Sequence, residues 1–361
     1  MDKEALRARV YPRIYDLSVL SDRNKRNSLK LWDFYQKAGF LYEGKLGLLE
    51  PLQNQIFDTY EKLLCCPDNT CEIIFIADKG ELIGSVMAAR YTNDTWMIQH
   101  IVALPGYRMA GVPKELILSI NSWMLKNKEM KYFINFFRPT TRWAMKTFYG
   151  IMGQVEDRNY MDINSFDYVF LDISKDYSEL EETNSISIRE MLPGVQEEIY
   201  SKLIKIRNKI VINSLGIFPE NFAIEEVRKK YSQIGLMRQR LHLIAEYKNE
   251  IVGFAFIDIS SAGISLSHIF DAFHIYAFNE SIKELVIFGL LNRINMILTN
   301  NGKIHSIGLV SNADRIIYEK AGYKVSKEYL CFAFSRNNDQ FLRTYDIVNS
   351  GERNPVNRQS K

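Results

Sequence analysis

Residues 71–91 read CEIIFIADKGELIGSVMAARY, and residues 241–259 read LHLIAEYKNEIVGFAFIDI. Each stretch has an apolar run, a short polar turn, a glycine after two apolar residues and a second apolar run, which is the pattern of a β-hairpin. After each hairpin we expect a strand, a long helix, another strand and a short helix, which ends in FYGIMG (148–153) or YEKAGY (318–323). This self-similarity predicts two copies of one fold.

Hydrophobic periodicity places the other elements. In the first half we expect helices at 28–38, 51–64, 113–126 and 140–152, and strands at 95–104, 131–137 and 167–173. In the second half we expect helices near 194–213, 219–233, 280–299 and 312–321, and strands at 264–270 and 303–310. Mixed strands and helices in this order predict an α/β protein, with an α+β mixed sheet and helices on both faces.

The composition is that of a globular protein, since 47% of residues are hydrophobic and 25% are charged. The length of 361 residues suits two cores better than one. The expected division is an N-terminal extension at 1–27, a first domain at 28–173, a linker at 174–185, a second domain at 186–335 and a polar C-terminal tail at 336–361.

The net charge of +3 argues against a dedicated nucleic-acid binder, which would concentrate basic residues on one face. No window approaches the roughly 20 apolar residues of a membrane span, and the N-terminus has no signal-peptide pattern. We therefore expect a cytoplasmic protein without a membrane or nucleic-acid partner. Cys65, Cys66 and Cys71 lie close together and Cys331 stands alone. That spacing lacks the second pair of a metal site, so no metal is expected.

The segment VALPGYRMAGVPKEL (102–116) lies between a predicted strand and a predicted helix. Pro105, Gly106 and Gly111 permit a tight turn, and the helix N-terminus offers unpaired N–H groups and the positive end of the helix dipole. Together these features form a cradle for phosphate. Arg108 can add a charge-assisted contact. The same residues also suit a plain connection between a strand and a helix.

The loop resembles the acetyl-CoA loop of the GCN5-related N-acetyltransferase (GNAT) superfamily, whose pattern is x-P-x-Y-R-x-x-G-x-G/A. Pro105, Tyr107, Arg108 and Gly111 match this pattern, and Pro113 departs from its last position. The resemblance implies two tandem GNAT-like acyl-CoA N-acyltransferase folds and a donor that is acetyl-CoA or another acyl-CoA. The residues implied to bind the donor are Ile101, Val102, Ala103, Arg108, Met109, Ala110, Gly111 and Val112.

The resemblance also implies where the chemistry occurs. The coenzyme would lie where strands 95–104 and 131–137 separate, and a bulge in the first strand would free an N–H group for the thioester carbonyl. His100 is the candidate base, directly or through water, because histidine titrates near neutrality. Strict alternation instead places His100 on one face with Trp96, Ile98 and Val102, as a core histidine.

Tyr149 stands four residues before Gly153, which matches the Y-x-x-x-G helix of the family. The resemblance implies that Tyr149 protonates the leaving thiolate, although an aromatic residue can equally close a helix. Gln99 faces away from His100 by alternation and is a candidate for substrate binding. Arg138 and Arg142 follow the second separating strand, where they would meet phosphate, an acidic substrate or only solvent.

The corresponding segment of the second half, SHIFDAFHIYAFNESIKEL (267–285), contains neither arginine nor glycine. Its aromatic residues are Phe270, Phe273, Tyr276 and Phe278, which fit packing between domains or a groove for an apolar substrate. No phosphate cradle is predicted there. The second copy is therefore expected to be degenerate and to shape the acceptor site.

The resulting hypothesis is an N-acyltransferase that moves an acetyl or longer acyl group from CoA to an amine of a small molecule or peptide. One alternative is a transferase with another donor, either an aminoacyl group or a long-chain acyl group. The other alternative is a non-catalytic tandem protein that binds ligands or regulates a partner. The sequence carries no signal for the oligomeric state.

Overall fold

The computed structural model describes residues 27–66, 70–153, 157–175, 185–220 and 222–336. The expected N-terminal extension lies outside the described residues except for Asn27. Most of the expected linker and nearly all of the C-terminal tail lie outside them as well. The described chain is an α/β protein with one mixed sheet and helices on both of its faces, as the sequence predicts.

The first half begins with helices and continues into alternating strands and helices. Its helices are α2 (Asn27–Lys37), α3 (Glu43–Leu49), α4 (Gln53–Leu64), α5 (Val112–Lys126) and α6 (Arg142–Met152), with short 3-10 turns η2 (Glu50–Leu52) and η3 (Pro105–Tyr107). Its strands are β1 (Cys71–Asp78), β2 (Glu81–Arg90), β3 (Thr95–Ala103), β4 (Tyr132–Phe137) and β5 (Met161–Asp172).

The second half repeats this order. Its strands are β6 (Ser187–Glu190), β7 (Arg238–Tyr247), β8 (Glu250–Ser260), β9 (Ala272–Ala277), β10 (His305–Val310) and β11 (Lys324–Ser335). Its α-helices are α7 (Gln196–Ile206), α8 (Lys209–Ser214), α9 (Glu225–Gln233), α10 (Lys283–Asn300) and α11 (Arg315–Lys320), with 3-10 turns η4 (Ile269–Asp271), η5 (Glu280–Ile282) and η6 (Asn312–Asp314).

Equivalent glycines confirm the repeat in atomic detail. A Cβ atom at Gly84 in β2 would lie 2.6 Å from Val112 in the first turn of α5. A Cβ atom at Gly253 in β8 would lie 2.4 Å from Val286 in α10. Only glycine lets each helix approach its hairpin this closely. The glycine after two apolar residues, quoted above from both stretches, therefore has the same packing role in both halves.

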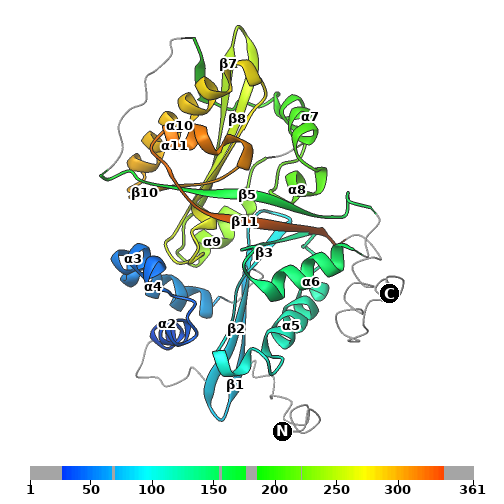
Figure 1. Cartoon of the computed structure of the whole chain (residues 1–361), viewed down its shortest axis with the longest axis vertical. Helices are drawn as coiled ribbons and strands as arrows, with labels where there is room; N and C mark the ends of the chain where they lie inside the picture. The colour runs from blue at the N-terminus through cyan, green and yellow to red at the C-terminus, as the bar shows by residue number, and fades with distance from the viewer. Residues whose placement is uncertain (1–26, 67–69, 154–156, 176–184, 221, 337–361) are drawn as a thin grey trace.

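The two halves share one sheet because their last strands lie between them. The strand order is β1-β2-β3-β4-β11-β5-β10-β9-β8-β7-β6. Strand β11 comes from the end of the second half but pairs with β4, and β5 comes from the end of the first half but pairs with β10. Figure 1 shows β5 and β11 crossing the middle of the molecule, with β1–β3 below them and β7 and β8 above.

The structure differs from the local expectations in several segments. The segment Glu43–Leu49 is helical although no element is predicted there, and the expected helix at 219–233 begins only at Glu225. The expected helix at 194–213 is divided into α7 and α8, because Arg207 is extended and the Asn208 side chain accepts the Ile210 N–H group as an N-cap. The expected strand at 264–270 is a loop that ends in η4, since Gly263 and His268 have φ angles of +96° and +56°. The strand begins only at Ala272.

The strands of the first half separate two cores, one on each face of the sheet. Helices α5 and α6 cover one face of β1–β4, and α2–α4 cover the other face near the carboxyl end of β3. In the second half, α10 and α11 form one core with the sheet, while α7–α9 contribute to a core that spans both halves. Within the described ranges, no helix has both the length and the apolar character needed to cross a bilayer.

Candidate functional site

Strands β3 and β4 separate at the point where the sequence motif predicts a coenzyme. They pair in parallel from Thr95 with Tyr132 to Ile98 with Asn135, and neither strand pairs with the other beyond that point. The Asn135 side chain donates a 2.7 Å hydrogen bond to the Ile98 carbonyl. Asn135 therefore joins the two strands where their ladder ends.

A β-bulge in β3 follows immediately. Met87 pairs with Gln99 and Ser85 pairs with Val102, so that one residue of β2, Val86, opposes both His100 and Ile101. His100 has a φ angle of +55°, in the left-handed region. A bulge leaves its extra residue outside the regular ladder and turns the strand. The bulge implied by the resemblance is thus present.

The bulge overturns the face expected for His100. Ile98 packs in the core beneath α5 and α6, whereas the His100 ring contacts Tyr35 and Phe40 on the α2–α4 side of the sheet. The extra residue and the positive φ angle place the His100 side chain on the face of the sheet opposite to that of Ile98. Alternation along a regular strand could not predict this position.

Both ring nitrogens of His100 have partners. Its Nδ1 lies 3.1 Å from the Tyr60 hydroxyl, and its Nε2 accepts the Leu266 N–H group at 3.1 Å. Burial lowers the pKa of His100 well below its usual value, and Lys45 lowers it further. His100 is therefore neutral and joins α4 to a loop of the second half. These contacts argue against its assignment as the base.

Gln99 also points toward the second half. Its Nε2 donates to the Ile264 carbonyl at 2.7 Å, while its Oε1 is buried with no hydrogen-bond partner among the described residues. Gln99 and His100 thus both hold residues 264–266. The amide oxygen of Gln99 can therefore accept a hydrogen bond from a ligand.

Arg108 fixes the start of the loop that follows β3. Its Nε donates to the Ala103 carbonyl at 3.1 Å, and its Nη2 donates to the Ala38 carbonyl at 2.5 Å. Tyr107 donates to Asp78 at 2.9 Å. The two matching motif residues therefore anchor the loop to α2 and β1. The Arg108 side chain nevertheless remains exposed.

Gly111 immediately precedes α5 and has a φ angle of +92°. A Cβ atom there would meet nothing within 4 Å, so the backbone conformation and not packing requires glycine. The Glu115 N–H group bonds to the Gly111 carbonyl, and Pro113 has no N–H group. The amides of Val112 and Lys114 have no backbone acceptor among the described residues, which leaves donors for an anion.

The remaining candidates differ in exposure. Val102, Ala103 and Val112 are buried, Ile101 and Ala110 are half-buried, and the Met109 side chain is 97% exposed. Tyr149 on α6 is 48% exposed, and Arg138 and Arg142 are exposed near the carboxyl end of β4. The structure brings the loop, the bulge and these arginines to the same end of the sheet.

Sequence reasoning missed Asn135, Tyr60 and Leu266. Asn135 gives a signal in the sequence, because it is the one amide side chain within the apolar run YFINFF. Tyr60 and Leu266 lie far from His100 in the chain and have no local signal. Within the described part of the chain, no group of three or more histidine, cysteine or acidic side chains is placed to hold a metal ion.

No protein-family model matches the sequence, and no curated protein matches it. Solved structures of GNAT proteins are similar to this chain. A tandem GNAT protein from the clavulanic acid biosynthesis pathway is 10% identical, with a TM-score of 0.42 over 78% of this chain and 89% of that chain. A GCN5-related N-acetyltransferase from Sphaerobacter thermophilus is 15% identical, with a TM-score of 0.43 over 73% and 80% of the two chains. A putative acetyltransferase from Pyrococcus horikoshii is 11% identical, with a TM-score of 0.45 over 86% of each chain.

Proposed function

We propose that the protein is an acyl-CoA-dependent N-acyltransferase whose donor binds in the first half. The observation that carries this proposal is the juxtaposition of three features. The ladder between β3 and β4 ends at Ile98, the bulge follows at His100 and Ile101, and the open first turn of α5 begins beyond Gly111. A gap, a displaced amide and an anion cradle are what a pyrophosphate-bearing thioester requires.

Each donor contact has a proposed residue. The edge of β3 at Ile101, Val102 and Ala103 would pair with the amide groups of the pantetheine arm. The loop from Arg108 through Met109 and Ala110 to Gly111 would surround the pyrophosphate, where the amide of Val112 donates. Pro113 removes one donor from this cradle, so the adjacent amide of Lys114 would carry more of the contact.

The proposed reaction is direct transfer. The amine nitrogen of the acceptor attacks the thioester carbonyl carbon, the C–N bond forms, and the C–S bond breaks after a tetrahedral intermediate. A main-chain N–H group at the bulge stabilises the oxyanion. The ammonium proton passes to water, and the thiolate takes a proton from Tyr149 or from solvent. His100 positions the bulge through its two hydrogen bonds and is not the base in this proposal.

The acceptor is proposed to be an amine of a small molecule or peptide. Gln99 presents its unpartnered amide oxygen between the halves, and Arg138 and Arg142 lie at the carboxyl end of β4. An acceptor that carries a carboxylate as well as its amine would meet these arginines. The second half contributes residues 264–266 to the same region through their bonds to Gln99 and His100.

Calorimetric titration of CoA, acetyl-CoA and a long-chain acyl-CoA tests the donor site. Gly111→Asp should weaken binding by about a hundredfold or more, since it places a carboxylate and a strained φ angle in the cradle. Gly302→Asp is the matched control: Gly302 has a φ angle of +68° and open space around its Cβ position, but it follows α10 in the second half. Equal loss in both variants would refute the assignment. No binding to the folded parent would favour a different donor.

A second candidate function is donor binding without turnover. The specific observation in its favour is that both nitrogens of His100 are occupied by Tyr60 and Leu266, so the expected base is not available. Acyl-CoA that binds with loss in Gly111→Asp, but is not consumed with any of a broad panel of amines, would support this candidate. Release of free CoA that depends on an added amine would exclude it.

A further inference from the structure

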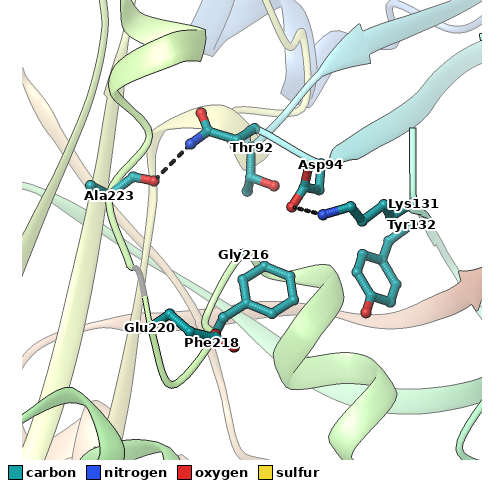
Figure 2. Close-up of a pocket in the computed structure, with 9 residues that line it drawn as sticks. Thr92, Asp94, Lys131, Tyr132, Gly216, Phe218, Glu220 and Ala223 are labelled. Carbon is teal, nitrogen blue, oxygen red and sulfur yellow. Dashed lines mark hydrogen bonds and ion pairs between the residues drawn. The ribbon is translucent and has the colours of Figure 1, made fainter. Parts of the chain in front are cut away.

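We propose that a cavity at the opposite end of β3 and β4 from the bulge binds a small organic cation, a guanidinium or a primary ammonium group. This inference goes beyond the proposed function. The cavity has a volume of about 330 Å³, at the small end of the range for ligand pockets. Its walls come from the turn between β2 and β3, the start of β4, and residues Gly216, Phe218, Glu220 and Ala223 of the second half. Figure 2 shows these three segments around the cavity.

Two aromatic rings line one side of the cavity. The centroids of the Tyr132 and Phe218 rings are 5.7 Å apart, and the rings are tilted by 38°. Tyr132 comes from the first half and Phe218 from the second. A cation over an aromatic face is attracted by the negative potential of the ring. A flat guanidinium group fits a site of this kind, because it also stacks on aromatic rings.

The charges of the cavity favour a positive ligand. Asp94 and Lys131 pair with each other at 3.2 Å and leave no net charge between them. Glu220 also lines the cavity, is exposed and forms no ion pair among the described residues. The lining therefore carries one uncompensated negative charge. An anionic or neutral ligand would bring no positive charge to pair with Glu220.

A buried hydroxyl group provides an independent sign of a ligand. The Thr92 residue is 2% exposed, and its Oγ1 has no hydrogen-bond partner among the described residues. Figure 2 shows the Thr92 side chain directed between Asp94 and Gly216. Buried hydroxyl groups in proteins are normally hydrogen-bonded. A ligand N–H group that donates to Thr92 would satisfy this oxygen.

The cavity is held open by the contacts between the two halves. Gly216 has a φ angle of +78°, and a Cβ atom there would lie 2.4 Å from the Thr92 methyl group. Asn93 donates to the Ala223 carbonyl at 3.3 Å, and its own Oδ1 accepts the Val227 N–H group. These contacts fix Gly216, Ala223 and Val227 against the turn of the first half. The site is therefore preformed and needs both halves.

Calorimetric titration of the full chain with n-butylguanidinium and with n-butylurea tests the proposal, because the two probes differ chiefly in charge. We expect n-butylguanidinium to bind and n-butylurea to bind at least about tenfold more weakly. Glu220→Gln should weaken the cation by about tenfold, and Thr92→Val by a smaller factor. The matched control Glu197→Gln changes an exposed carboxylate of α7 and should leave affinity unchanged.

Gly111→Asp should also leave n-butylguanidinium affinity unchanged, which separates this site from the proposed donor site. Equal binding of the two probes would overturn the proposal, as would unchanged affinity in Glu220→Gln. Absence of binding at about 10 mM n-butylguanidinium to the folded parent would overturn it as well. Because Glu220 is exposed, its substitution is not expected to prevent folding.

Discussion

The ladder between β3 and β4 in the first half and the ladder between β9 and β10 in the second half end at equivalent pairs, but the side chains at the two ends differ. The pairing registers align Ile98 and Asn135 with Phe273 and Gly308. In the first half a small amide joins the strands. In the second half the Phe273 ring occupies the space where a Cβ atom of Gly308 would be, with a nearest separation of 2.4 Å.

The two halves also differ in the length of the equivalent strand and helix. Strand β9 lacks the extra residue of the bulge in β3, and α10 begins about one turn earlier than α5. Strands β8 and β9 pair without a register shift, so a single residue, Ile275, stands where β3 has His100 and Ile101. The equivalent of Gly111 is Leu285, as judged from the contacts of Gly84 and Gly253, and Leu285 lies inside α10. The longer helix leaves no open loop at this place.

These differences distinguish the copy in which we propose a donor site from the copy in which we propose none. The second half lacks the bulge in the strand and the glycine before the helix, and it has a packed aromatic cluster instead. Phe273 contacts Tyr318 and Tyr323 at centroid distances of 6.4 and 5.9 Å. The half that lacks the features proposed for donor binding is thus the half in which this aromatic core is packed. The substitutions below should affect binding in one half and stability in the other.

Phe273→Ala should have the largest effect on stability. Phe273 is fully buried, and removal of a buried phenylalanine ring costs about 3–5 kcal/mol in free energy of unfolding. Urea unfolding followed by circular dichroism measures this loss. The donor affinity of the folded fraction should not change. A loss below about 1 kcal/mol would show that the cluster around Phe273 does not act as a core and would remove the contrast between the halves.

His100→Asn should have an intermediate effect. Asparagine tolerates the positive φ angle but cannot keep both hydrogen bonds, so the Leu266 N–H group loses its acceptor. A buried donor without a partner costs about 1–3 kcal/mol in free energy of unfolding. We expect turnover to fall in step with the fraction of folded protein. A fall of about a hundredfold at full folding would return His100 to the role of base.

The pH dependence sharpens this prediction. Burial holds the pKa of His100 well below its unfolded value, so the unfolded chain binds the proton first as pH falls. His100 therefore stabilises the fold fully above pH of about 6.5, and each unit below removes about 1.4 kcal/mol until the folded pKa is reached. Urea unfolding at two pH values should show this loss of free energy of unfolding in the parent. In His100→Asn the loss should be smaller by the contribution of one proton, about 1.4 kcal/mol per pH unit. Equal losses would contradict the assignment.

Other buried histidines also reduce the free energy of unfolding at low pH, and they are still present in His100→Asn. Burial lowers the pKa of His242 and His274 to about 3 and that of His268 to about 4. All three lie in the second half. The loss of free energy of unfolding that remains at low pH in His100→Asn should therefore reflect the histidines of the second half. The difference between this loss and that of the parent should reflect His100 at the bulge of the first half.

Local patterns in the sequence predicted most elements and the loop at Gly111, because each depends on neighbouring residues. They could not predict that β5 pairs with β10 of the second half and β11 with β4 of the first half, since pairing between distant strands leaves no local signal. The position of His100 failed for a related reason. One extra residue in β3 reverses the alternation, and the bulge is visible only against the register of β2. The cavity at Thr92 joins segments about 125 residues apart and had no motif at all.

Tyr149→Phe should have the smallest effect. A thiol with a pKa of about 8.5 leaves as a thiolate without much help, so we expect turnover to fall by less than about tenfold. Tyr149 is 48% exposed, and Tyr149→Ala should change the free energy of unfolding by no more than about 0.5 kcal/mol.

Its counterpart in the second half supplies the matched control. Tyr318 also stands four residues before a glycine, but it is 1% exposed and packs against Phe273. Tyr318→Ala should therefore cost about 3–5 kcal/mol in free energy of unfolding. The same motif would then serve the reaction in one half and the core in the other. A hundredfold loss of turnover in Tyr149→Phe would make this tyrosine a required acid, whereas equal stability losses in the two alanine variants would mean that the halves do not differ at this helix.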